Sequence, residues 1–168
     1  MFYFRILFFS FLLCGFSCRH KNTPKTVTPE TLKEPLIDAN KKYVSQEADE
    51  IDDYAKRHKW EMKQTGTGLR YMIYKEGTGA KAETGKYAKV NYKISLLNGT
   101  ECYSSDNSGP KKFLIGQDNV ESGLHEGILF MKVGDKAMFI LPSHLAHGFQ
   151  GDGNKIPPRS SVVYDIEL

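Results

Sequence analysis

The last third of the chain alternates apolar and polar residues in two short segments, and this period of two constrains the fold most. Every second residue is apolar: Ala137, Phe139 and Leu141, and then Val162, Tyr164, Ile166 and Leu168. Successive side chains of a β-strand point to opposite faces, so this pattern is typical of strands with one buried face. A loop with Gly148 and Pro157-Pro158 separates the two segments, which predicts strand, loop, turn and closing strand.

Earlier segments of similar length extend this β pattern toward the N-terminus. We expect strands at Leu69–Tyr74, Val90–Leu96, Glu101–Ser104 and Phe113–Ile115. The dipeptide Asn98-Gly99 stands between the second and the third of them. It is a common hairpin turn because both residues tolerate positive φ. The sequence therefore predicts a mostly antiparallel sheet.

One helix is expected within the same domain, over Val120–Met131. Its apolar residues fall on one side: Val120, Leu124, Ile128 and Met131. Gly123 and Gly127 each cost a helix about 1 kcal/mol relative to Ala, so we expect them to permit a close approach to the sheet. The predicted fold class is α+β, an antiparallel sheet wrapped around one short helix, with an N-terminal helical extension.

The N-terminus has the composition of an export signal. Arg5 is followed by an apolar run from Ile6 to Phe16, which is shorter than the roughly 20 residues of a membrane-spanning helix. The run ends at Gly15-Phe16-Ser17-Cys18, which is similar to a bacterial lipobox. We expect residues 1–17 to be a lipoprotein signal peptide and Cys18 to be lipidated, so that the chain is anchored to a membrane of the bacterial cell envelope and faces the periplasm. An uncleaved anchor and an ordinary signal peptide are the alternatives.

Two further segments precede the strands. Residues 18–28 are polar, basic and contain Pro24, which is typical of a flexible tether. Residues 29–60 are expected to form a helical extension, with the following residues at helical spacing: Ile37, Val44, Ala48, Ile51, Ala55 and His58. This helix could pack on the domain, pair with a copy of itself, or hold the domain away from the membrane. Residues 61–168 form the main domain.

Charge and cysteine content narrow the possible functions. The chain has 23 Lys and Arg against 20 Asp and Glu. The two signs are interleaved, so we expect no nucleic-acid partner. Of the three cysteines, Cys14 leaves with the signal and Cys18 carries the lipid in this interpretation. Only Cys102 then remains, which excludes an internal disulfide and suggests a small buried apolar residue.

Several short motifs follow one another in a characteristic order: Val90-Asn-Tyr92, Leu97-Asn-Gly99, Ser104-Ser105, Glu126-Gly127, Leu145-Ala146-x-Gly148, Ile156-Pro-Pro158 and Tyr164-Asp-Ile-Glu-Leu168. With these motifs, residues 69–168 resemble the FKBP-type peptidyl-prolyl cis-trans isomerases. The resemblance implies an FKBP-like fold, isomerisation of X-Pro bonds, no cofactor and no metal. The helical extension and lipobox are further similar to FKBP-type lipoproteins of gliding bacteria.

The resemblance also assigns roles to residues by position. It implies a catalytic set of Tyr92, Tyr103, His147 and Tyr164. It implies a substrate-binding set of Cys102, Val120, Glu121, Leu124 and Ile156. Three residues differ from those usual in the family: Tyr103 replaces an Asp, His147 replaces a Tyr, and Leu124 replaces a Trp. Tyr103 cannot supply the negative charge of that Asp. At Glu121 the family uses the backbone N–H, so the side chain is expected to matter less.

The implied reaction suits a pocket without a nucleophile. Rotation about an X-Pro bond passes through a twisted amide, over a barrier of about 18–20 kcal/mol, and a dry apolar pocket favours that state. We therefore expect an isomerase that assists the folding of envelope proteins through their proline-containing segments. The alternatives are a catalytically weak module that binds such segments, and a component of envelope machinery, such as a gliding apparatus. His144 and His147 have a spacing seen in metal sites, but no third ligand is evident, so no metal is expected.

Overall fold

The computed structural model describes residues 29–168, with side chains from Lys33 onward. The predicted signal peptide (1–17), the tether (18–28) and the lipidation site Cys18 lie outside the described residues. The helices are α1 (Pro29–Arg57), α2 (Ser105–Ser108), α3 (Ser122–Ile128) and the 3-10 helix η1 (Ser143–Leu145). The strands are β1 (Lys63–Gln64), β2 (Arg70–Lys75), β3 (Tyr87–Leu96), β4 (Glu101–Ser104), β5 (Lys111–Leu114), β6 (Lys136–Leu141) and β7 (Val162–Glu167).

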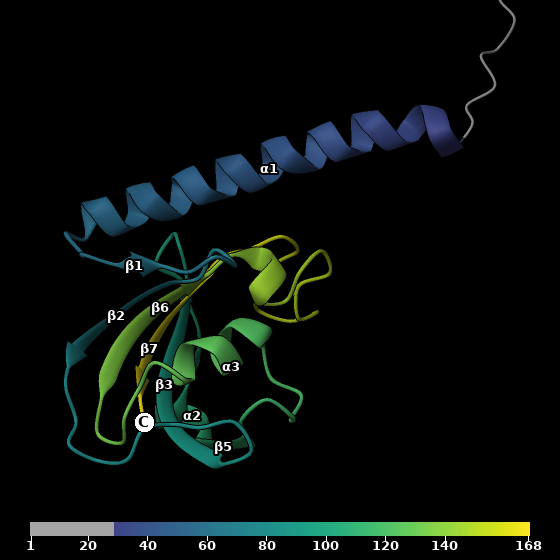
Figure 1. Cartoon of the computed structure of the whole chain (residues 1–168). Helices are drawn as coiled ribbons and strands as arrows, with labels where there is room; N and C mark the ends of the chain where they lie inside the picture. Colours follow the sequence, from purple (N-terminus) through teal and green to yellow (C-terminus); the bar gives the residue numbers. More distant parts are fainter. Residues whose placement is uncertain (1–28) are drawn as a thin grey trace, which may run out of the picture.

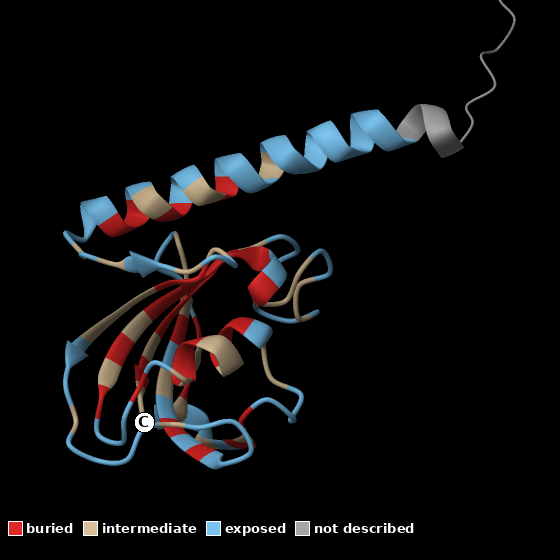
Figure 2. Ribbon diagram, viewed as in Figure 1, coloured by how far each residue is buried: buried red, intermediate tan, exposed pale blue. Residues whose placement is uncertain are grey.

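The strands form one antiparallel seven-stranded sheet that curves around α3 (Figure 1). Its order is β1-β2-β6-β7-β3-β4, and β5 pairs with the other end of β3. The main core lies between the inner face of the sheet and α3, where Val90, Phe139 and Tyr164 are buried against Leu124 and Ile128 (Figure 2). Full burial of one such side chain contributes roughly 1.5–3 kcal/mol. This arrangement confirms the predicted α+β class.

Helix α3 approaches the sheet closely because two of its residues are glycines. A Cβ atom at Gly123 would lie 2.6 Å from Cγ of Leu141, and one at Gly127 would lie 2.7 Å from Cε2 of Phe139. The role expected for these glycines is therefore confirmed. The predicted helix over Val120–Met131 is too long, since Glu121 is extended at ψ 136°. Residues 129–131 instead donate their backbone N–H groups to carbonyls three residues earlier, which tightens the chain after the helix.

The C-terminal half of α1 packs on the opposite face of the sheet, where β6 ends and β7 begins (Figure 2). A second apolar cluster forms there, composed of Ile51, Tyr54, Ala55, Ile140 and Val163. Ile140 and Val163 are paired across the two strands and point away from α3, because neighbouring residues of a strand face opposite sides. The N-terminal half of α1 extends past the sheet, and its Leu36 is 64% and its Ile37 37% exposed. Three roles were possible for this helix from the sequence, and the structure shows the first of them for its C-terminal half, which packs on the domain.

An ion pair between a buried arginine and a half-exposed aspartate also joins α1 to the sheet. Arg70 of β2 is only 4% exposed, and its Nε and Nη2 each lie 3.0 Å from Oδ1 of Asp52. Its Nη1 donates to the Gly68 carbonyl at 2.7 Å. A buried guanidinium needs such partners. The helix therefore supplies the carboxylate that makes burial of Arg70 possible.

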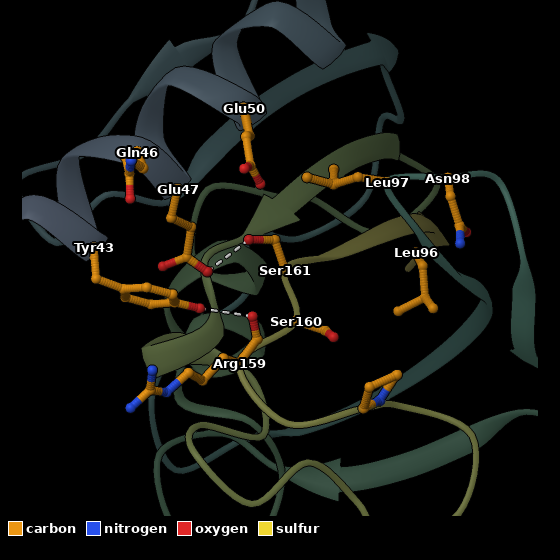
Figure 3. A pocket seen from close by; sticks show the side chains of 11 residues that line it. Tyr43, Gln46, Glu47, Glu50, Leu96, Leu97, Asn98, Arg159, Ser160 and Ser161 are labelled. Atoms are coloured by element: carbon orange, nitrogen blue, oxygen red, sulfur yellow. Dashed lines mark hydrogen bonds between the residues drawn. The ribbon is translucent and has the colours of Figure 1, made fainter.

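A buried carboxylate holds α1 to the domain about one turn before Asp52. Glu47 is 6% exposed and accepts hydrogen bonds from the Ser143 amide (2.7 Å), the Ser143 hydroxyl (3.2 Å) and the Ser161 hydroxyl (2.7 Å). The Tyr43 hydroxyl donates to the Arg159 carbonyl at 2.8 Å (Figure 3). Glu47 therefore ties α1 to both ends of the segment 142–161, which follows β6 and leads into β7.

Three smaller features differ from the sequence prediction. β5 begins at Lys111 rather than at Phe113, because the β3 ladder imposes strand geometry on two lysines of low β propensity. β1 lies between the helical extension and the first predicted strand, where no strand was expected, and it pairs with β2. α2 was not expected, and it begins where the Ser104 hydroxyl accepts a hydrogen bond from the Asp106 amide. In the part of the chain that is described, no helix is both long and apolar enough to cross a membrane.

Candidate active site

A cavity of about 390 Å³ lies where the start of α3, the sheet and the loop after η1 meet. Strands β3, β4, β5 and β7 contribute several of its walls, and the loop after η1 closes one side. The lining residues are Val90, Tyr92, Ile94, Tyr103, Lys111, Glu121, Leu124, His147, Asp152, Asn154 and Tyr164. The whole predicted catalytic set is present among them, together with Glu121 and Leu124 of the predicted substrate-binding set.

Six of the eleven residues that line this cavity are aromatic or aliphatic. Tyr92 is half-buried, and its hydroxyl lies 2.9 Å from Oγ of Ser108. Leu124 is 1% and Tyr164 2% exposed. The Tyr164 hydroxyl has no hydrogen-bond partner within the described residues. Burial and the nearby negative charge of Glu121 raise the pKa of Tyr164 well above its ordinary value, so this ring stays neutral.

The Glu121 side chain lies inside the cavity, although the sequence predicted little role for it. The side chain is 9% exposed, and its Oε1 lies 3.1 Å from Nε2 of His147. Its Oε2 lies 4.0 Å from Nζ of Lys111, beyond hydrogen-bond distance, and has no hydrogen-bond partner in the described structure. The cavity therefore contains a buried carboxylate that is only partly satisfied.

A second carboxylate supplies a negative charge beside Tyr103. The Tyr103 hydroxyl donates a hydrogen bond to Oδ2 of Asp152. Oδ1 of Asp152 accepts from the amides of Asn154 and Ile156, both at 2.8 Å. Burial acts to raise the pKa of Asp152, but these hydrogen bonds outweigh it and lower the pKa to about 2. The charge that Tyr103 itself cannot supply is thus present one hydrogen bond away.

Three residues of the predicted substrate-binding set lie outside the lining. Cys102 is 1% and Ile156 2% exposed, and both belong to the main core. The Cys102 thiol lies 3.6 Å from the Lys155 carbonyl, and burial raises its pKa. Val120 is half-buried and packs against the core from just before α3. These residues support the walls of the cavity from behind.

Five lining residues were not predicted as site residues from the sequence: the apolar Val90 and Ile94, and the polar Lys111, Asp152 and Asn154. Lys111 belongs to a pair of lysines that resembles an ordinary solvated surface. Asp152 lies between Gly151 and Gly153, and Asn154 follows directly, in a stretch where such residues usually form turns. One available signal was the replacement of the family's Asp by Tyr103, because a phenol in a pocket needs a hydrogen-bond acceptor.

The two histidines at metal-like spacing contact different groups. His144 is hydrogen-bonded through Nε2 to the Thr67 carbonyl at 2.9 Å, whereas His147 contacts Glu121. Among residues 33–168, no group of three or more metal-ligating side chains is placed to hold an ion.

A second cavity, of about 340 Å³, lies between α1 and the segment before β7 (Figure 3). Tyr43, Glu47 and Glu50 of α1 face Leu97 and Ser161 across it. Each oxygen of the Glu47 carboxylate already accepts at least one hydrogen bond from the protein. The first cavity is therefore the better candidate for a site, because it alone of the two contains unsatisfied buried polar atoms.

The sequence pattern of the FKBP-type peptidyl-prolyl cis-trans isomerases matches residues 78–168, which contain every lining residue of the first cavity. The chain belongs to this family. It is 43% identical over 108 residues to the FKBP-type peptidyl-prolyl cis-trans isomerase FkpA of Aeromonas hydrophila, covering 64% of this chain and 39% of that protein. It is 33% identical over 150 residues to a probable FKBP-type isomerase of Haemophilus influenzae, covering 84% of this chain and 61% of that protein.

Solved structures of the family have the same architecture. The crystal structure of FkpA from Escherichia coli superimposes with a TM-score of 0.64 at 29% identity, over 85% of this chain and 72% of that one. The crystal structure of AtFKBP13 gives a TM-score of 0.61 at 33% identity, over 64% of this chain and 96% of that one. The chain spans only about two fifths of the length of the Aeromonas relative, at 39%.

Proposed function

We propose that this protein is a peptidyl-prolyl cis-trans isomerase that assists the folding of envelope proteins. The observation that carries this proposal is the cavity walled by Tyr92, Leu124 and Tyr164 in a chain of the FKBP family. Isomerisation of X-Pro bonds is slow enough to limit folding. An exported isomerase therefore accelerates a step that its substrates need.

The cavity acts by differential binding of the twisted amide. The proline ring enters the apolar region beside Leu124 and Tyr164, where water is excluded. The twisted amide has less charge separation than the planar one, so transfer from water into this region favours it. By resemblance to the family, the Glu121 backbone N–H donates to the substrate carbonyl. No bond to the protein forms or breaks in this mechanism.

Replacement of one wall tests the site. We expect Tyr92→Ala to lower the rate of cis-to-trans conversion of an apolar-X-Pro peptide by about tenfold or more, because a pocket wall is lost. Tyr87→Ala is the matched control, since Tyr87 lies on the same strand, is 65% exposed and does not line the cavity. Equal rates for both variants would show that the site is placed wrongly. No acceleration by the folded unaltered chain would refute the isomerase function.

We further propose that the mature chain begins at Cys18 and is anchored through lipid on that residue, facing the periplasm. The short apolar run and the lipobox-like Gly15-Phe16-Ser17-Cys18 support this proposal. Metabolic labelling with a fatty acid should mark the unaltered chain and be lost in Cys18→Ala. Persistent label in that variant would exclude Cys18 as the site.

One observation favours a second candidate function, a peptide-binding module with little turnover. Charged groups of Glu121, Asp152 and Lys111 line the cavity, and a polar pocket favours the twisted amide less than a fully apolar one does. Tight binding of proline-containing peptides without acceleration would establish this function in place of the first.

A further inference from the structure

Two buried polar atoms of the first cavity have no hydrogen-bond partner among the described residues, namely Oε2 of Glu121 and the hydroxyl of Tyr164. The Glu121 side chain is 91% buried, being 9% exposed. A buried carboxylate oxygen without a donor is costly, and the cost is higher than for a neutral group. A ligand that supplies an N–H donor at this point would remove that cost on binding.

Charge in the cavity favours a cationic donor over a neutral one. Glu121 and Asp152 each bring a carboxylate to the lining, whereas Lys111 brings one ammonium group. Asp152 is ionised at neutral pH because its pKa is about 2. Lys111 stands 4.0 Å from Oε2 and its side chain is 39% exposed, so solvent screens much of its charge. His147 also lines the cavity, with its Nε2 3.1 Å from Oε1 of Glu121, so the two carboxylates of the lining outnumber its one permanent cation, Lys111.

We propose that this pocket selects proline-containing segments in which the residue before the proline is Lys or Arg. This inference rests on the proposed isomerase function. The carbonyl of that preceding residue belongs to the rotating bond, so its side chain leaves the peptide beside the proline ring. A long cationic side chain there reaches Oε2 of Glu121 and donates the missing hydrogen bond. A Glu at the same position meets two carboxylates and is rejected.

The test compares three peptides that differ only before the proline, with Lys, Leu or Glu, in a protease-free isomerisation assay at low salt. We expect kcat/KM for the Lys peptide to exceed that for the Glu peptide by about tenfold, the effect of one charge-assisted hydrogen bond. Glu121→Gln should bring the two values within about twofold of each other. Glu101→Gln is the matched control, since Glu101 pairs with Lys93 outside the cavity and its side chain is 45% exposed.

A second variant keeps the proposal testable if Glu121→Gln does not fold. Lys111→Gln removes the only ammonium group of the lining from a partly exposed position and should increase the preference for Lys over Glu. Equal acceleration of all three peptides by the unaltered chain would overturn the proposed selectivity but leave the isomerase function standing. No acceleration of any peptide would instead refute the isomerase function on which the selectivity rests.

Discussion

We expect a large loss of stability when the Glu47 carboxylate, which holds the segment 142–161, is removed. Glu47→Ala leaves the Ser143 amide and the hydroxyls of Ser143 and Ser161 without their acceptor, in a place where both serines are 5–6% exposed. The two hydroxyls can rotate toward other acceptors, whereas the amide cannot. A hydrogen bond to a charged group contributes about 1.5–3 kcal/mol, and a buried unpaired donor costs about 1–3 kcal/mol. We therefore expect the free energy of unfolding to fall by about 3 kcal/mol.

Urea denaturation measures this loss directly. With an m-value of roughly 2 kcal/mol per M, the midpoint should fall by about 1.5 M. The single tryptophan of the chain, Trp60, reports on the docking of α1, because its ring lies 5.7 Å from that of Tyr54 and 4.7 Å from that of His58. Fluorescence should therefore change together with ellipticity if α1 and the sheet unfold as one unit.

Glu50→Ala is the control for helix propensity and for the loss of one negative charge. Glu50 lies one turn from Glu47 on the same helix but is exposed. We expect its replacement to change the free energy of unfolding by less than about 0.5 kcal/mol. If Glu47→Ala were no more destabilising than Glu50→Ala, the buried hydrogen bonds of Glu47 would not be what holds α1 to the domain.

Three further predictions concern other parts of the domain. Gly127→Ala should lower the free energy of unfolding by about 1–3 kcal/mol, measured by urea denaturation, because the added Cβ would press on Phe139. The better helix propensity of Ala does not offset this. Gly66→Ala is the control and should be nearly neutral, since a Cβ at Gly66 would meet nothing within 4 Å. In a variant without Cys14 and Cys18, the Cys102 thiol should react with a thiol reagent only after unfolding, because the thiol is buried and burial raises its pKa. Rapid reaction of the native variant would contradict the buried position of Cys102. Folding lowers the pKa of Asp152 from 3.8 to about 2. The ionised Asp152 carboxylate therefore stabilises the folded state above pH 3.8, and this stabilisation is lost as the pH falls toward 2. In Asp152→Asn, the stability should depend less on pH in that range.

The sheet was predictable because its residues obey a local rule. The alternation of Val90 and Ile94 with polar neighbours places them on the face toward α3, and the structure buries both. Asn98-Gly99 predicted the hairpin between β3 and β4, and Gly99 has φ 86° in the turn. Each of these signals acts within a few residues, so the sequence alone contains it.

The buried polar contacts of the domain and of the site were less predictable, because they depend on contacts between distant segments. Glu47 stands among exposed acidic residues of a helix, and nothing local separates it from Glu50. Its partners are 96 and 114 residues away. Asp152 resembles a turn residue, and only the sheet brings Tyr103 to it, 49 residues away. Burial of a charged residue follows from tertiary packing, which has no short-range sequence pattern.

The segment 142–161 connects α1 to the pocket, and this connection predicts an asymmetry between two variants. Glu47 holds both ends of the segment from the outer face, while Tyr103 holds its middle from inside the cavity through Asp152. Release of the ends frees the whole segment, including His147, whereas release of the middle leaves both ends fixed. Glu47→Ala should therefore change both Trp60 fluorescence and isomerase turnover, and Tyr103→Phe should change turnover alone. A Tyr103→Phe variant with altered Trp60 fluorescence would show instead that the cavity and α1 respond as one rigid unit.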